Sequence, residues 1–267
     1  MAFVNYVTKN LAIKIVYYGP GLSGKTTNLR YIYSKLDPDS RGDLICLETD
    51  TERTIFFDLL PVKAGLIGDF KVHFQLMTVP GQVFYEASRK SVLKGVDGIV
   101  FVADSQVPLL DANLENFDSL RRNLLEHKID LNFIPMVFQY NKRDLDNLIP
   151  VETFNNLLNP RSLPYIESSA IYGLGVIETL KEISKLTVPL VREKILGEKR
   201  EEIPKEKKEI KEEERKIEVI EPIPKKEAEV VAEAETAPLR LTKIKFKSQK
   251  DIEEELEKLA REFTAKK

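Results

Sequence analysis

The sequence predicts an α/β fold, with a central, mostly parallel sheet and helices on both of its faces. Short apolar runs alternate with stretches of helical composition over residues 1–197. The runs 98–103 and 136–140 are almost wholly apolar, which is typical of strands that are buried on both faces. The run 70–76 alternates apolar and polar residues, which indicates a strand with one buried face.

Each element is predicted from its local pattern. The segment 13–18 is rich in β-branched and aromatic residues and stops at Gly19, so we expect a strand that leads into a turn. Helices are expected where the intervening stretches have helical composition. The expected strands are 13–18, 70–76, 98–103, 136–140 and 163–167, and the expected helices are 26–36, 111–127, 151–158 and 176–193.

Charge divides the chain into segments of different composition. Of 41 basic and 43 acidic residues, 19 and 20 fall in the last 70 positions, whereas all 12 glycines lie before them. We therefore predict a globular domain at 1–197, a charged disordered linker at 198–238 and an amphipathic segment at 239–267. The net charge of −2 argues against nucleic-acid binding driven by counterion release.

The amphipathic segment has apolar residues at helical spacing, namely Ile252, Leu256, Leu259, Ala260 and Phe263. Its helix has two main interpretations: a surface helix that folds back on the body, or a docking motif for another protein. A membrane-surface helix is a third interpretation, but alternating Glu and Lys residues on the polar face argue against it.

Nothing in the sequence indicates export or membrane insertion. Cys46 is the only cysteine, so no intramolecular disulfide can form, and no apolar run reaches the roughly 18 residues of a membrane helix. Ala2 argues against N-myristoylation, and residues 264–267 contain no cysteine for prenylation, so we expect no covalent lipid anchor. We expect a cytoplasmic protein with no direct membrane anchor.

A phosphate-binding loop is predicted between the first strand and the first helix. Residues 19–26 read Gly-Pro-Gly-Leu-Ser-Gly-Lys-Thr and fit G-x-x-x-x-G-K-[ST]. The backbone N–H groups of such a loop surround phosphate at a helix N-terminus, while Lys25 supplies charge and Thr26 a hydroxyl for Mg²⁺. The expected phosphate contacts are Gly19, Gly21, Leu22, Ser23, Gly24, Lys25, Thr26 and Thr27.

A base-reading loop is predicted at the end of the strand 136–140. Asn141, Lys142 and Asp144 form N-K-x-D, in which Asp144 can accept hydrogen bonds from N1–H and the 2-amino group of guanine. Adenine lacks both donors. Ser169 and Ala170 follow the next strand, and we expect the Ala170 N–H to reach guanine O6. Without the phosphate loop, this motif would be read as a solvated charged loop.

These motifs, together with Pro80-Gly81-Gln82, resemble those of Ras-like small GTPases and so imply a P-loop small GTPase fold. The segments 17–21, 53–58, 78–85 and 94–98 are similar to the MglA family, bacterial GTPases of polarity and motility. The resemblance covers about residues 1–195. It implies a guanine-nucleotide switch that binds GTP or GDP with Mg²⁺ and slowly hydrolyses GTP.

Two positions depart from the wider Ras pattern. Thr78 stands where most of these GTPases have an aspartate that supports Mg²⁺, a departure that the MglA family shares. We therefore expect magnesium to rely on Thr26, Thr54, nucleotide oxygens and water. Ile171 replaces the usual lysine after Ser-Ala, which removes one contact to the base.

The resemblance also implies catalytic residues and partners. Arg53 matches a finger arginine in cis, and the adjacent Thr54 matches the threonine that reads Mg²⁺ and the γ-phosphate. Gln82 follows Gly81, whose N–H can sense the γ-phosphate, so Gln82 is placed to orient water. The expected partners are an MglB-like GTPase-activating protein of roadblock fold and GTP-state effectors, with recruitment to cell poles through partners.

Two other functional classes remain as alternatives. The first is a pseudo-GTPase scaffold that binds nucleotide without useful turnover. The second is an ATP-dependent kinase, which Asp144 disfavours. The aromatic pairs 56–57 and 84–85 have two interpretations, core packing or a partner surface that GTP exposes.

Overall fold

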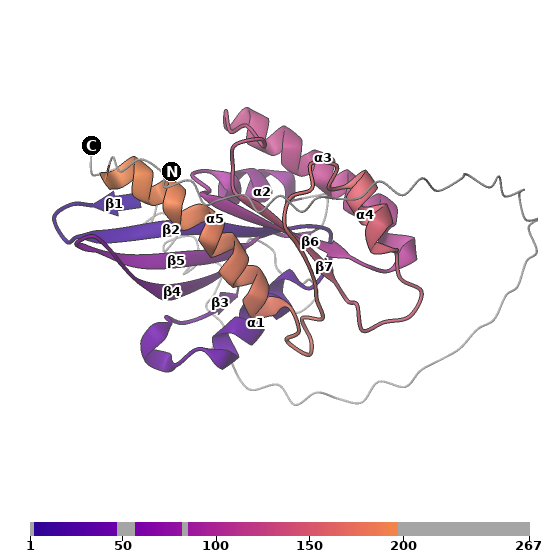
Figure 1. Cartoon of the computed structure of the whole chain (residues 1–267), viewed down its shortest axis with the longest axis horizontal. Helices are drawn as coiled ribbons and strands as arrows, with labels where there is room; N and C mark the ends of the chain where they lie inside the picture. Colours follow the sequence, from indigo (N-terminus) through magenta and orange to yellow (C-terminus); the bar gives the residue numbers. More distant parts are fainter. Residues whose placement is uncertain (1–2, 47–56, 82–84, 197–267) are drawn as a thin grey trace, which may run out of the picture. The chain divides into compact units, whose positions relative to one another are not determined.

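The computed structural model describes residues 3–46, 57–81 and 85–196 (Figure 1). The predicted residues Arg53, Thr54 and Gln82 lie outside this part, as do the predicted linker and C-terminal segment. Those predictions remain predictions. None of the helices in the described ranges is both long and apolar enough to cross a bilayer.

A single sheet forms the centre of the described part, in the order β3-β4-β5-β2-β6-β7-β8, with β1 paired to β2. The neighbours from β5 to β8 run parallel, whereas β1, β3 and β4 join antiparallel. The mostly parallel sheet is thus confirmed. The strands are β1 Phe3–Asn5, β2 Asn10–Tyr18, β3 Ile45–Cys46, β4 Asp58–Ile67, β5 Phe70–Thr78, β6 Gly98–Asp104, β7 Met136–Asn141 and β8 Tyr165–Glu167.

Helices cover both faces of the sheet (Figure 1). Ile13 and Ile15 of β2 share one core with α1 and α5, while Val16 and Tyr18 of the same strand share the other with α2, α3 and α4. The side-chain alternation of one strand therefore supplies two cores. The helices are α1 Lys25–Lys35, α2 Glu86–Leu93, α3 Leu110–Glu126, α4 Val151–Leu157 and α5 Val176–Leu196, with short 3₁₀ turns at Pro38–Ser40 and Val107–Leu109.

All nine predicted elements are present, with ends that shift by a few residues. Four others were not predicted: β1, β3, β4 and α2. Strand β4 contains Pro61 and Gly65, which are uncommon in strand interiors. It forms because its antiparallel pairing with β5 continues past a bulge between Lys63 and Gly65.

Candidate functional site

The predicted phosphate loop joins the carboxyl end of β2 to α1. Gly24 caps the helix with a φ of 99°, in the region that favours glycine, and a Cβ atom there would collide with the side-chain amide of Asn141. A Cβ atom on Gly19 would collide with the carbonyl oxygen of Val102. The loop therefore lies directly against the ends of the neighbouring strands, where only glycine fits.

Lys25 is buried at the base of this loop. Its Nζ donates hydrogen bonds to the carbonyl oxygens of Gly19, at 2.9 Å, and of Pro20. The pKa of Lys25 is lowered to about 7, chiefly by burial; the charge of Asp58 opposes this shift, and the charge of Arg89 adds to it. A negatively charged group beside Lys25 would favour its charged form.

Thr26, the predicted magnesium residue, is bonded to a carboxylate that we did not predict. Its Oγ1 donates to Asp58 Oδ2 at 2.6 Å, and Thr78 Oγ1 donates to the same oxygen at 2.7 Å. Asp58 is fully buried, and its Oδ1 has no hydrogen-bond partner in the described part of the chain. Asp58 thus supplies a carboxylate in the place where Thr78 lacks one.

Asn141 ties the base loop to the phosphate loop. Its Nδ2 donates to the carbonyl oxygen of Ser23 at 2.7 Å, and its Oδ1 accepts from Ser168 Oγ at 3.0 Å and from the N–H of Ala170 at 2.9 Å. The Ala170 N–H, which we expected to reach guanine O6, is therefore engaged by Asn141 in this structure. Three loops at one sheet edge are held together through one side chain.

The other residues of the base loop are set by their neighbours. Asp144 is exposed, so its carboxylate is accessible. Lys142 has a φ of 66° and forms an ion pair of 2.6 Å with the buried Asp104, which no motif identified. Arg143 binds Glu167 at 2.8 Å and the carbonyl oxygen of Ile149 at 2.9 Å, so it braces the loop.

The loop after β5 completes the described part of the site. A Cβ atom on Gly81 would collide with the backbone of Gly21, so this loop lies directly on the phosphate loop. The structure therefore brings the described residues of the predicted site together at the edge where the parallel strands end. They are Gly19, Gly21, Leu22, Ser23, Gly24, Lys25, Thr26, Thr27, Gly81, Asn141, Lys142, Asp144, Ser169 and Ala170.

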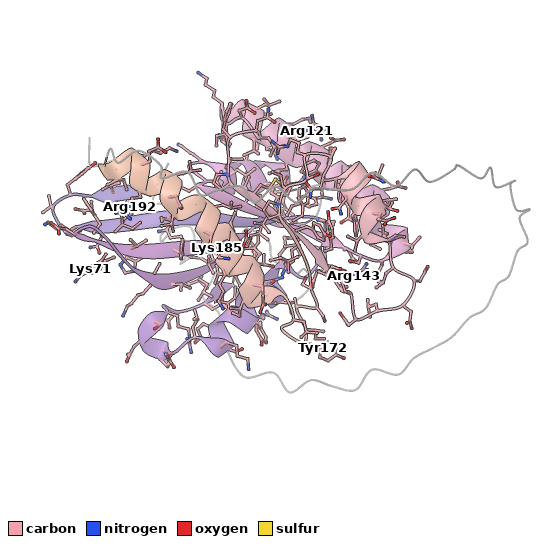
Figure 2. All side chains as sticks on the ribbon, viewed as in Figure 1. Lys71, Arg121, Arg143, Tyr172, Lys185 and Arg192 are labelled. Carbon is pink, nitrogen blue, oxygen red and sulfur yellow. The ribbon has the colours of Figure 1, made fainter. Side chains whose placement is uncertain are left out.

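Figure 2 labels residues at both ends of the parallel strands. Arg143 and Tyr172 lie where the parallel strands finish, and Lys71 and Arg192 lie where they begin. Signals for the two missed carboxylates were weak, because Asp58 and Asp104 are far along the chain from the residues they bind. Only Asp104 had a local signal, since it directly follows the predicted strand 98–103 at the ligand-binding edge.

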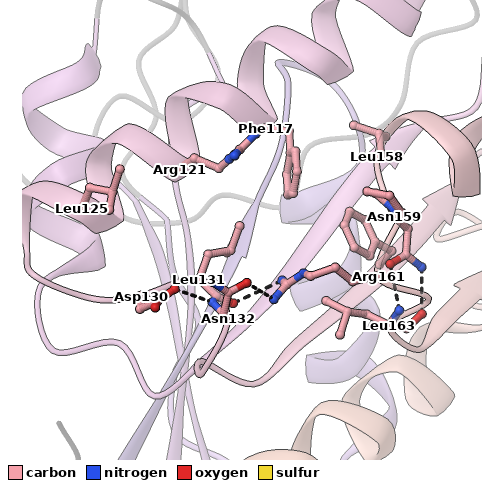
Figure 3. Close-up of a pocket in the computed structure, with 12 residues that line it drawn as sticks. Phe117, Arg121, Leu125, Asp130, Leu131, Asn132, Leu158, Asn159, Arg161 and Leu163 are labelled. Atoms are coloured by element: carbon pink, nitrogen blue, oxygen red, sulfur yellow. Dashed lines mark hydrogen bonds between the residues drawn. The ribbon is translucent and has the colours of Figure 1, made fainter.

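A separate cavity of about 390 Å³ lies near the opposite edge, where β7 and β8 begin (Figure 3). Its lining is partly apolar and includes Arg121 and Arg161. The guanidinium of Arg161 donates hydrogen bonds to Asn132 Oδ1 and to the carbonyl oxygen of Leu131. None of the predicted site residues lines it. No cluster of three or more His, Cys, Asp and Glu side chains suited to a metal occurs among the described residues.

Comparison with known proteins agrees with this geometry. No family model matches the chain. The mutual gliding-motility protein MglA of Myxococcus xanthus (strain DK1622) is 55% identical over 188 residues, which cover 70% of this chain and 96% of that protein. Identity at this level over nearly the whole relative shows common descent and a common α/β small GTPase fold. The chain belongs to the MglA family of small GTPases.

Proposed function

We propose that this protein is a cytoplasmic, guanine-nucleotide-dependent switch that binds GTP and slowly hydrolyses it to GDP, and that it controls cell polarity or gliding motility. The observation that carries the proposal is the bond from Asn141 to the Ser23 carbonyl, which joins the phosphate loop to the base loop. The two parts of a nucleotide are thereby recognised at a fixed separation. The name of the Myxococcus relative supports the role in motility.

Phosphate recognition would rest on α1 and the loop before it. The first N–H groups of a helix have no partners within the helix, so they can donate to phosphate oxygens. Lys25 adds an amino group whose side chain is already buried in the site, and bound phosphate would favour its charged form.

The residues around Thr26 fit a magnesium ion. Hard oxygen donors suit this cation, and the site offers the Thr26 hydroxyl and the free Oδ1 of Asp58. Thr26 would hold the ion, and Asp58 would support Thr26 through their hydrogen bond. Thr54 is a further predicted ligand. When bound, Mg²⁺ offsets phosphate charge. The protein's own contribution is to orient the Thr26 hydroxyl through its bond to Asp58.

Guanine recognition would rest on Asp144, whose carboxylate is exposed at the end of the base loop. The test is Asp144→Asn. Loss of the acceptor pair should weaken GDP binding by about 2–4 kcal/mol and favour xanthine nucleotides, because a carbonyl and an amide then face the 2-position of the base. Unchanged GDP affinity would reject guanine recognition by this loop.

Hydrolysis would rest on Gln82 and Arg53, with Gln82 orienting water and Arg53 offsetting the charge that develops on the γ-phosphate. A roadblock-fold activating protein is the proposed partner that positions both, and effectors would bind the GTP state. The competing interpretation is a pseudo-GTPase scaffold. Single-turnover phosphate release with and without the roadblock partner distinguishes them, since a scaffold would show no stimulated release.

A further inference from the structure

Asp104 is a buried carboxylate at the end of β6 that belongs to none of the nucleotide motifs. Its side chain is 1% exposed, and its Oδ2 lies 2.6 Å from Lys142 Nζ. Its Oδ1 accepts from the backbone N–H and the side-chain amide of Gln106, each at 3.1 Å. Lys142 belongs to the base loop, so Asp104 connects this loop to the central sheet.

The backbone of Asp104 is also held in place. Its N–H donates to Asn113 Oδ1 at 2.9 Å, and Asn113 Nδ2 donates back to its carbonyl oxygen at 2.8 Å. Asn113 lies in α3 and is fully buried. On the other side, Asp104 pairs in register with Asn141 of β7. The carboxylate therefore projects from a rigid support.

The base loop is held to the same support at both of its ends. Ser105 N–H donates to the Asn141 carbonyl at 3.0 Å, Val107 N–H to that of Asn147 at 3.1 Å, and Ile149 N–H to that of Ser105 at 2.8 Å. Between these anchors, Lys142 has a positive φ, which is unfavourable for a lysine. The ion pair to Asp104 offsets this cost, because a buried carboxylate strongly favours a partner of opposite charge.

We propose that Asp104 is a positioning residue for guanine recognition. It holds Lys142 in its left-handed conformation and thereby keeps Asp144, two residues further on, in position to bind the guanine base. Asp104 itself does not contact the nucleotide. This proposal rests on the proposed function, since it assigns Asp104 to the same base site.

The test measures the dissociation rate of a fluorescent GDP analogue from the full chain loaded with Mg²⁺. Asp104→Asn should raise the rate by about tenfold or more, the equivalent of 1.4 kcal/mol. Lys142→Ala should raise it too, and the double variant should release no faster than the faster single variant, because both changes break one interaction. Effects that multiply would show that Asp104 acts independently of Lys142.

Asp97→Asn is the matched control. Asp97 is a buried carboxylate just before the same strand begins, where it accepts a hydrogen bond from the Lys14 N–H at 3.0 Å, away from the base loop. Its variant should release GDP within about twofold of the wild-type rate. If Asp104→Asn does not fold, Asp104→Ser leaves a smaller polar group in place and should also raise the rate.

A wild-type rate in a folded Asp104 variant, or effects that multiply in the double variant, would overturn the proposal. The outcome is separable from failure of the proposed function. If the wild-type chain does not retain GDP, or if Asp144→Asn leaves base selectivity unchanged, the guanine site itself is wrong. If Asp144→Asn changes selectivity while Asp104→Asn changes nothing, only the role of Asp104 is wrong.

Discussion

The hydroxyl of Thr26 donates a 2.6 Å hydrogen bond to the carboxylate of Asp58, although the two residues are 32 positions apart in the chain. Asp58 begins β4, and it lies beside Thr78 at the end of β5, whose Oγ1 also accepts from the Asp58 backbone N–H at 2.9 Å. A neighbouring antiparallel strand thus supplies the negative charge that the end of β5 lacks. This relationship leads to the first prediction.

Asp58→Asn should remove the dependence of nucleotide binding on magnesium, because an amide cannot support a cation as a carboxylate does. In the wild-type chain, chelating Mg²⁺ should accelerate GDP release by about tenfold or more. In the variant, release should be equally fast with and without chelator. Asp69→Asn is the control, since Asp69 is an exposed carboxylate paired with Lys9. A variant that still releases GDP slowly only with Mg²⁺ would contradict this role.

Gly24→Ala and Gly65→Ala separate the effect of backbone strain from that of a collision in the site. Both glycines have similar φ angles, 99° and 93°, but a Cβ atom on Gly65 meets nothing within 4 Å, whereas one on Gly24 meets Asn141. Each substitution should cost about 1–2 kcal/mol of unfolding free energy from strain. Only Gly24→Ala should also weaken GDP binding, by about a hundredfold or more. Urea unfolding and GDP titration measure the two effects, and equal GDP affinities would refute the close packing of the loops.

GDP binding should take up a proton near pH 8. Burial lowers the pKa of Lys25 to about 7, so the folded chain without nucleotide carries a largely neutral Lys25 at pH 8, and phosphate would restore its charge. Calorimetry in two buffers of different ionisation enthalpy measures the uptake. Lys25→Met should abolish it. Binding of GDP by the wild-type chain with no proton uptake would argue against a neutral Lys25.

The same pKa predicts how stability varies with pH. Because the folded-state pKa of Lys25 is below its unfolded value, the cost of burying its charge is fully present below about pH 7 and is relieved as pH rises toward 10.5. The free energy of unfolding without nucleotide should therefore increase with pH above 7. Denaturant titrations at several pH values should show a smaller increase for Lys25→Met than for the wild-type chain, and an equal increase would point to other groups.

Gln82→Leu should retain GTP binding while partner-stimulated hydrolysis slows by roughly a hundredfold or more, because the lost interaction is made chiefly in the transition state. Arg53→Ala should behave in the same way. Single-turnover phosphate release in the presence of the roadblock protein is the measurement. Intact stimulation of Arg53→Ala would assign the finger arginine to the partner instead.

Local sequence determined the two loops that we propose to bind nucleotide. Phosphate and base recognition each need residue types within a few positions of one another, so 19–26 and 141–144 could be recognised before any contact was known. The alternation of apolar runs and helical stretches likewise determined the α/β class, since strand and helix periods are read over short windows. The division of the chain at residue 198 rests on composition alone and remains a prediction.

Tertiary structure alone decided which carboxylates support these loops. Asp58 reaches Thr26 because β4 pairs antiparallel with β5. Strand β4 could not be predicted from its local pattern, because it contains Pro61 and Gly65. Asp104 reaches Lys142 because β6 and β7 are neighbours in the sheet, 38 residues apart at these positions. It likewise decided that the Ala170 N–H binds Asn141. Hydrogen bonds and ion pairs between strands depend on sheet order and register. Both arise from packing of the whole domain, so no periodic pattern in the sequence predicts these contacts.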